Sequence, residues 1–239
     1  MHAILPLKDL VAAKSRLGGI LSAAERRSLM QAMVEDVLTT LAGHDQVDSI
    51  TVVSDDPGAA HLCVAYAAAY LDERSLGCSG LNPVLEATVD TLIPDSDGPL
   101  MILHGDLPLL DASDISAVIA AQADLGGVVI GCDRAGSGTN LLAFGASARP
   151  RLGFGADSCR RHQQAAATAS APVQVLHRPG IGLDVDEPQD ILLLLDGLDD
   201  LGPDSKTAAL LTDTPLGRRL ALALQPGSAI DRDNRKISH

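Results

Sequence analysis

Three short acidic or glycine-rich segments carry the residue types of this chain that are best suited to chemistry. They are residues 105–108 (Gly-Asp-Leu-Pro), 136–140 (Gly-Ser-Gly-Thr-Asn) and 182–186 (Gly-Leu-Asp-Val-Asp). Each lies next to an apolar run, which predicts a place where a buried strand gives way to a loop, and α/β folds bind their ligands there. Carboxylates at such an edge, near backbone amides freed by glycine, suit a divalent cation that holds phosphates.

Three aspartates are the candidate metal ligands. Asp106 follows the apolar run 99–104 and precedes another, so we favour a functional role over that of a turn residue. If residues 181–185 are extended, Asp184 and Asp186 point to one face, and a cation would relieve the repulsion between them. The alternative is a helix N-cap pair ahead of Pro188, a role that Asp186 could fill alone but Asp184 could not. The sequence therefore predicts a metal site.

Two glycine-bearing loops carry hydroxyl groups. Thr139 lies in the first, residues 136–140, and Ser158 ends the second, residues 153–158. Ser158 is expected near the start of a helix, where free amides and the helix dipole favour anions. Together the loops could cradle a small phosphorylated acid, although each loop read alone indicates only a flexible turn.

A basic loop follows the first predicted strand. It holds Lys8, Lys14 and Arg16, in a chain that is poor in cations elsewhere. Such a cluster suits a triphosphate, the alternative being ordinary solvated charges. The loop matches neither the P-loop nor the dinucleotide-binding pattern. No histidine shows metal spacing or a pairing with a nucleophile, which disfavours a hydrolase triad, and only His104 is expected near the site.

Composition limits the classes of function. The chain has 239 residues, of which 46% are hydrophobic but only 2% aromatic, so the core must be built from Ala, Val, Leu and Ile. The net charge of −13 argues against a nucleic-acid partner. Four cysteines without zinc spacing predict free thiols in a reducing compartment. No apolar window reaches the length of a membrane span. We therefore expect a cytoplasmic protein with no membrane partner.

Apolar periodicity and turn residues predict the elements. Strands are expected at 2–7, 48–54, 99–104, 127–132, 140–144 and 173–177, and helices at 22–41, 81–92, 111–124, 158–169 and from 188. Strands alternating with helices predict an α/β fold, a mostly parallel sheet with helices on both faces. Right-handed crossovers then bring the strand carboxyl ends to one edge. We expect a domain at 1–197 and a helical appendage with a flexible tail at 198–239.

The order of the motifs resembles a known family. The motifs are Leu-Pro-Leu-Lys at 5–8, Ala-Lys-Ser-Arg-Leu at 13–17, Gly-Leu-Asn at 80–82, Gly-Asp-Leu-Pro-Leu at 105–109, Gly-Thr-Asn at 138–140, Phe-Gly-x-x-Ser at 154–158 and Leu-Asp-Val-Asp-x-Pro at 183–188. As a set, they resemble the CofC/FbiD guanylyltransferases of coenzyme F420 biosynthesis over about residues 2–196.

The resemblance implies a fold and a reaction. The fold would be the glycosyltransferase-A type of nucleotide-diphospho-sugar transferases. The reaction would move GMP from GTP onto the phosphate of phosphoenolpyruvate, 2-phospho-L-lactate or 3-phospho-D-glycerate, with magnesium (Mg2+) as cofactor. Pyrophosphate would be released, and the product would pass to the downstream F420 transferase. A homodimer and the choice of guanine are expected on this resemblance alone.

The resemblance also implies roles for individual residues. The metal ligands would be Asp106, Asp184 and Asp186. The triphosphate would meet Lys8, Lys14 and Arg16, which with Asp106 form the expected catalytic set. The small acid would be held by Thr139, Asn140, Gly155 and Ser158. The nucleoside would lie near Ser54, Gly80, Leu81 and Asn82.

Two features depart from the family pattern, and two other functions stay open. His104 stands before the Gly-Asp pair, where a smaller or cyclic residue is expected, and the chain beyond residue 197 is longer than the family core needs. A different nucleotidyltransferase, acting on a sugar phosphate or the molybdenum cofactor, would carry a glycine-rich loop after the first strand, and here no glycine precedes Gly18. The other alternative is a non-catalytic nucleotide-binding module.

Overall fold

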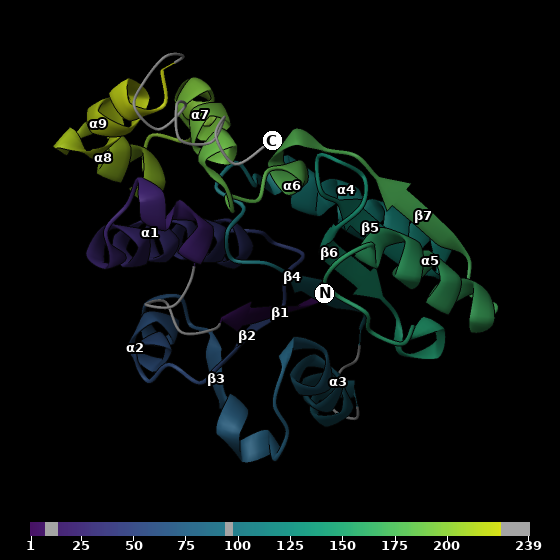
Figure 1. The fold of residues 1–239 in the computed structure, drawn as a ribbon. Helices are drawn as coiled ribbons and strands as arrows, with labels where there is room; N and C mark the ends of the chain where they lie inside the picture. Colours follow the sequence, from purple (N-terminus) through teal and green to yellow (C-terminus); the bar gives the residue numbers. More distant parts are fainter. Residues whose placement is uncertain (8–13, 94–97, 226–239) are drawn as a thin grey trace, which may run out of the picture.

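A seven-stranded sheet organises the chain in the computed structural model, which describes residues 1–7, 14–93 and 98–225 (Figure 1). Lys8, predicted to meet the triphosphate, lies outside the described residues. The strands are β1 (His2–Leu7), β2 (Ser49–Ser54), β3 (Ala69–Asp72), β4 (Leu100–Leu103), β5 (Val128–Cys132), β6 (Thr139–Phe144) and β7 (Val173–Leu176). Their order across the sheet is β3-β2-β1-β4-β6-β5-β7. The predicted α/β class is confirmed.

One strand runs against the others. β6 is antiparallel to both of its neighbours, whereas the remaining pairs are parallel. The first residues of β6, Thr139 and Asn140, therefore lie at the edge where the parallel strands end. The amide of His104, just past β4, donates to the Asn140 carbonyl at 3.0 Å. This reversal brings a glycine-rich loop to the same edge as Asp106.

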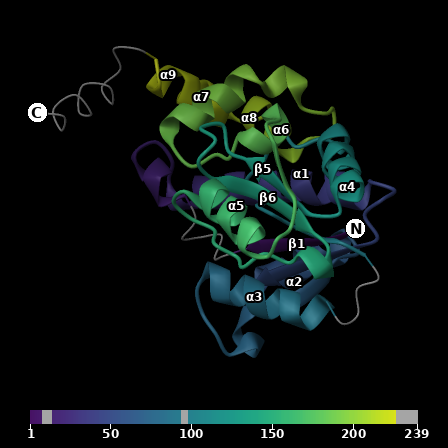
Figure 2. The same ribbon diagram turned by 90° about the vertical axis from the view of Figure 1, so that its right-hand side faces the viewer.

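Helices cover both faces of the sheet. They are α1 (Ala23–Ala42), α2 (Gly58–Ala65), α3 (Leu81–Leu92), α4 (Ala112–Leu125), α5 (Ser158–Thr168), α6 (Pro179–Gly182), α7 (Pro188–Asp196), α8 (Lys206–Thr212) and α9 (Pro215–Ala223). Alternate strand residues point to opposite faces. Leu5 therefore packs in the core beneath α1 and α4, whereas Ile4 packs in the core beneath α3 and α5 (Figure 2). Two hydrophobic cores thus pack on the two faces of the sheet.

A capping box begins α1. The Ser22 hydroxyl accepts from the Glu25 amide at 3.3 Å, and the Glu25 carboxylate accepts from the Ser22 amide at 2.8 Å. These bonds satisfy amides that a helix start leaves without intrahelical partners. The four cysteines are free thiols, as expected. Among the described helices, none has the length and apolar character needed to cross a bilayer.

The helices of the predicted appendage pack against the sheet-covering layer. α8 and α9 lie beside α1 and α7 (Figure 1). The Asp36 carboxylate of α1 accepts from the amides of Lys206 at 2.7 Å and Thr207 at 2.9 Å, so a residue of α1 caps α8. Leu220 of α9 is fully buried in the core that includes α1. The boundary at residue 197 itself stays a prediction.

The extended segment predicted at 181–185 is wrong at its start. Residues 179–182 form the short helix α6, because Pro179 at its first position favours a helical start. Gly180 allows this turn to pack closely, since an added Cβ would lie 2.6 Å from the Leu109 carbonyl oxygen. The backbone is extended only from Leu183. Asp184 and Asp186 therefore lie in the segment between α6 and α7, which is not a strand of the sheet.

Candidate active site

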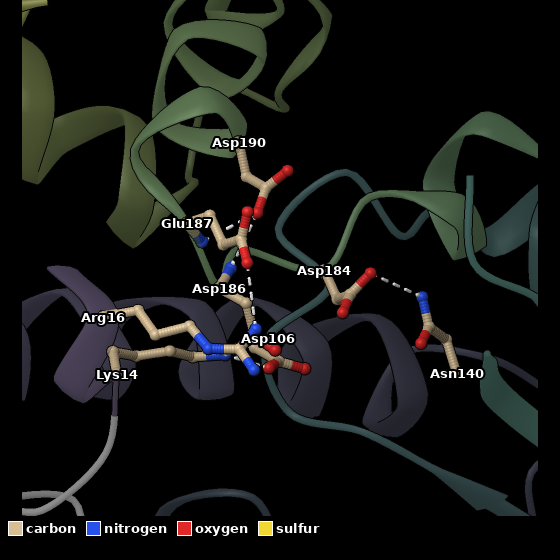
Figure 3. Close-up of polar contacts among 8 residues, drawn as sticks. All are labelled: Lys14, Arg16, Asp106, Asn140, Asp184, Asp186, Glu187 and Asp190. Carbon is tan, nitrogen blue, oxygen red and sulfur yellow. Dashed lines mark hydrogen bonds and ion pairs between the residues drawn. The ribbon is translucent and has the colours of Figure 1, made fainter. Parts of the chain in front are cut away.

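A buried lysine joins two of the three predicted metal ligands (Figure 3). The Lys14 ammonium donates to the Asp106 carboxylate and, at 2.5 Å, to Asp186 Oδ1. Only 6% of the Lys14 side chain and 16% of the Asp106 side chain are exposed. Lys14 precedes the short helix at Ser15–Gly19, Asp106 follows β4, and Asp186 precedes α7. Three distant parts of the chain thus meet at one sheet edge.

The electrostatics keep this buried pair charged. Burial by itself would lower the pKa of Lys14, but the charges of Asp106 and Asp186 raise that pKa overall. Burial likewise opposes the ionisation of Asp106, and the Lys14 charge outweighs it, so the pKa of Asp106 is lowered. Each charge therefore stabilises the other in a place with little water.

Asp184 is held apart from the lysine. Its carboxylate accepts from Asn140 Nδ2 at 3.1 Å, and the same amide group donates to the Ile181 carbonyl at 2.9 Å (Figure 3). Burial, followed by the nearby charge of Asp106, raises the pKa of Asp184. Asn140, predicted as an acid-binding residue, thus orients a carboxylate here. The site holds more negative charge than Lys14 alone neutralises.

The carboxylates have the donor type that Mg2+ requires. Asp106 Oδ1 is buried and has no hydrogen-bond partner among the described residues, an arrangement that a bound cation would satisfy. Carboxylate oxygens are the ligands that this hard cation prefers. Within the described ranges, no three acidic, histidine or cysteine side chains are grouped so that they could hold a metal ion as they stand. The three aspartates therefore match a metal in the type of donor atom, whereas their present arrangement is not a complete ligand set.

The start of α7 leaves Asp186 free to serve the site. The N-cap is Glu187, and the Asp190 carboxylate accepts from the amides of Asp186 at 3.0 Å and Glu187 at 2.8 Å. The alternative role of Asp186 as the side-chain cap is therefore not adopted. Arg16, predicted to meet the triphosphate, pairs with Glu187 at 3.0 Å, and both side chains are largely exposed.

A cleft of about 670 Å³ opens beside the carboxylates. Its walls include four of the predicted site residues, Arg16, Gly155, Asp184 and Asp186. Sequence reasoning missed Asp133, Arg134 and Asp190, which also line it. Asp133 and Arg134 follow directly after β5, so the rule that pointed to Asp106 could have found them.

The two hydroxyl-bearing loops lie together, as the sequence predicts. The Cys159 amide of α5 donates to the Ser137 carbonyl at 3.0 Å, which joins the loops. Ser158 is buried at the start of α5, and Gly155 takes a φ of 111°, a conformation that favours glycine. Thr139 is also buried, and its hydroxyl lies 3.0 Å from Nδ1 of His162.

One of the predicted nucleoside segments, residues 80–82, contacts the 153–158 loop. Asn82, at the start of α3 with Gly80 and Leu81, accepts from the Phe154 amide at 2.7 Å and donates to the Phe154 carbonyl at 3.0 Å. Its side chain therefore holds the 153–158 loop. Ser54 is buried at the end of β2 and accepts from the Asp56 amide at 3.0 Å. In the part of the chain that the structure describes, neither Ser54 nor Asn82 is hydrogen-bonded to the carboxylate cluster.

Comparison with known proteins identifies the family. The model of the family described as "Guanylyl transferase CofC like" matches residues 1–206. The chain belongs to this family. It is 37% identical over 190 residues to a phosphoenolpyruvate guanylyltransferase of Conexibacter woesei, covering 79% of this chain and 84% of the relative. It is also 37% identical over 195 residues to a protein of the same name from Roseiflexus sp., covering 81% and 84%.

A solved structure supports the fold of this CofC-like guanylyltransferase. A protein from Desulfovibrio desulfuricans G20, assigned as a nucleotide-diphospho-sugar transferase, aligns with a TM-score of 0.77 at 16% identity, over 92% of this chain and 96% of that one. At this identity the likeness establishes the fold alone. The predicted fold type is confirmed.

Sequence reasoning missed the contribution of His162 to the guanylyltransferase. This residue is fully buried in α5 and contacts both Thr139 and Gly153. Its sequence neighbours, Arg161 and Gln163, form no motif with it, so no local pattern marked it. His104, which was expected near the site, stacks edge-on against Phe154 at 5.4 Å between ring centres.

Proposed function

We propose that this guanylyltransferase moves GMP from GTP onto the phosphate of phosphoenolpyruvate, in the biosynthesis of coenzyme F420. Family membership and the names of its relatives support this choice of acid over 2-phospho-L-lactate and 3-phospho-D-glycerate. The structural observation that carries the proposal is the set of three carboxylates at one sheet edge, two of which pair with Lys14. Asp106 has a buried oxygen without a partner among the described residues, and the pKa of Asp184 is raised. Both features fit a site that binds additional positive charge.

The reaction needs no strong general base. The second pKa of a phosphomonoester is about 6, so the attacking phosphate oxygen is largely ionised at pH 7. A new bond forms between this oxygen and the α-phosphorus of GTP, while the bond from that phosphorus to pyrophosphate breaks. The enzyme then contributes chiefly in-line positioning and neutralisation of charge.

Lys14, Arg16 and the aspartates would divide the work of charge neutralisation. Lys14 stays protonated because Asp106 and Asp186 raise its pKa, so it can meet a phosphate oxygen as a fixed cation. Arg16 reaches the cleft from the same loop and can form paired hydrogen bonds to phosphate. Held by Asp106, Asp184 and Asp186, Mg2+ would neutralise charge on the phosphates.

The acid would lie against the joined glycine-bearing loops. Thr139 and Ser158 supply hydroxyls there, and the helix dipole at the start of α5 favours an anion. Gly155 lets the backbone approach the acid closely, because it has no side chain to intervene. The nucleoside would bind near Ser54 and residues 80–82.

A coupled assay tests the reaction and the choice of acid. GTP is incubated separately with each of the three acids and Mg2+, the downstream F420 transferase is added, and products are identified by mass. We expect pyrophosphate release and a product with phosphoenolpyruvate, and none when ATP replaces GTP or EDTA removes the metal. Turnover with another acid would correct the substrate, whereas no acid-dependent turnover would reject GMP transfer.

A further inference from the structure

His162 lies between the two loops proposed to hold the acid. It is completely buried in α5, with its ring 4.8 Å from that of Phe154 in an edge-to-face contact. One ring nitrogen, Nε2, is 2.9 Å from the Gly153 amide, and the other, Nδ1, is 3.0 Å from the Thr139 hydroxyl. One imidazole ring thus links both halves of the proposed acid pocket.

The two contacts fix which nitrogen carries the proton. A backbone amide can only donate, so Nε2 of His162 must accept from Gly153 through its lone pair. The proton of the neutral ring is then on Nδ1 and is donated to Thr139 Oγ1. Burial, followed by the charge of Arg161, lowers the pKa of His162 to about 4, which keeps the ring neutral at pH 7.

The fixed tautomer also sets the direction of the Thr139 hydroxyl bond. Because the Thr139 oxygen accepts from His162, its own hydrogen is left to donate, and the described residues contain no hydrogen-bond acceptor for it. Thr139 is 3% exposed, so this hydrogen lies where little water reaches it. A buried hydroxyl whose hydrogen is left without an acceptor is matched by an anionic oxygen.

We propose that His162 is a positioning residue, which presents the Thr139 hydroxyl as a donor to an anionic oxygen of the acid substrate. The inference rests on the proposed function, because Thr139 must contact the acid. The same ring holds Gly153, and Asn82 holds the neighbouring Phe154 backbone, so the loop that carries Gly155 is fixed against Thr139. His162 therefore couples the two halves of the pocket without touching the substrate.

Two substitutions separate the two hydrogen bonds of the ring. In His162→Asn, the amide nitrogen can take the place of Nδ1 and donate to Thr139, whereas the contact with Gly153 is lost. In His162→Gln, the amide oxygen can reach the place of Nε2 and accept from Gly153, whereas the donor to Thr139 is lost. Both variants replace the ring with a smaller neutral amide, so each controls for the loss of packing in the other.

Steady-state kinetics with phosphoenolpyruvate and GTP then test the role. We expect His162→Gln to raise the KM for the acid about tenfold or more, as loss of a hydrogen bond to a charged group predicts, with the KM for GTP changed less than twofold. His162→Asn, which keeps a donor to Thr139, should avoid most of this rise in the KM for the acid. Equal effects of the two variants, or parallel rises in both KM values, would show a structural role only and overturn the proposal. Thermal unfolding of both variants checks that each is folded.

Nitrogen-15 NMR of the imidazole tests the tautomer without any turnover. We expect the His162 signals of an Nδ1–H ring in the free protein. An Nε2–H ring in an active enzyme would overturn the role of His162 while leaving GMP transfer intact. If the wild-type enzyme turned over none of the three acids, the proposed function would fall, and the substrate-positioning role of His162 with it.

Discussion

At the scale of residues, the site is unevenly paired. Lys14 pairs with Asp106 and Asp186, while Asp184 accepts from the Asn140 amide and remains close to the charge of Asp106. The raised pKa of Asp184 means that this carboxylate opposes folding when it is ionised. The position of Asp184 at the cleft is therefore better explained by ligand binding than by stability. Neutralising Asp184 and neutralising Asp186 should change the free energy of unfolding in opposite directions.

We predict that Asp184→Asn stabilises the ligand-free protein at pH 7, whereas Asp186→Asn destabilises it. The first change removes a repelled charge, and the second removes a partner of buried Lys14. Because the folded protein binds the Asp184 proton more tightly than the unfolded chain does, wild-type stability from this group falls as pH rises from about 3.9 through the raised pKa. The advantage of Asp184→Asn should therefore shrink as pH falls through the raised pKa and should be absent below about 3.9.

Urea unfolding across this pH range measures the stability of both variants, and the coupled assay measures their activity. Both should lose at least about 100-fold in kcat/KM, since each helps to place positive charge at the transferred phosphate. A stabilised Asp184→Asn enzyme with full activity would reject the metal-ligand role of Asp184. Equal destabilisation by the two substitutions would contradict the electrostatic account.

At the scale of elements, the sequence predicts most of what places the site. Acidic residues directly after apolar runs predicted the end of β4 and the segment before α7, because the chain leaves the core where a buried strand ends. The reversed direction of β6 was not predictable, since the same residues fit a strand of either direction. Pro179 and Gly180 turned an expected strand into α6. His162 acts through residues 9 and 23 positions away, and no local pattern carries such contacts.

The appendage should contribute to stability and not to chemistry. Leu220 of α9 is fully buried against the main core, whereas Leu222 on the same helix is 56% exposed. We predict that Leu220→Ala lowers the free energy of unfolding by about 2–4 kcal/mol, with KM values unchanged. Leu222→Ala, its matched control, should change it by less than about 0.5 kcal/mol. Chemical denaturation measures the free energy of unfolding of both variants. Equal effects of the two substitutions would mean that α9 is not part of the folded core.

At the scale of the whole molecule, the site exists only when the chain is folded. Its charged residues come from the segment after β1, the end of β4 and the segment before α7, so the unfolded chain cannot reproduce the cluster. The Val185 amide donates to the Asp106 carbonyl at 3.2 Å, which ties two of these segments directly. Ligands that bind the assembled cluster must therefore stabilise the entire fold.

We predict that GTP with Mg2+, each at about 100 times its Kd, raises the melting temperature by about 5–10 °C, because such saturation adds about 2.7 kcal/mol per site in a chain of this length. EDTA should abolish most of the shift. Asp184→Asn should keep a small shift from contacts of GTP with Lys14 and Arg16, but should lose its metal-dependent part. An equal shift with EDTA present would show that GTP binds without the cation. A full metal-dependent shift in Asp184→Asn would place the cation away from this cluster. Calorimetric scans at fixed ionic strength separate specific binding from screening, since the net charge of −13 makes any added salt reduce self-repulsion.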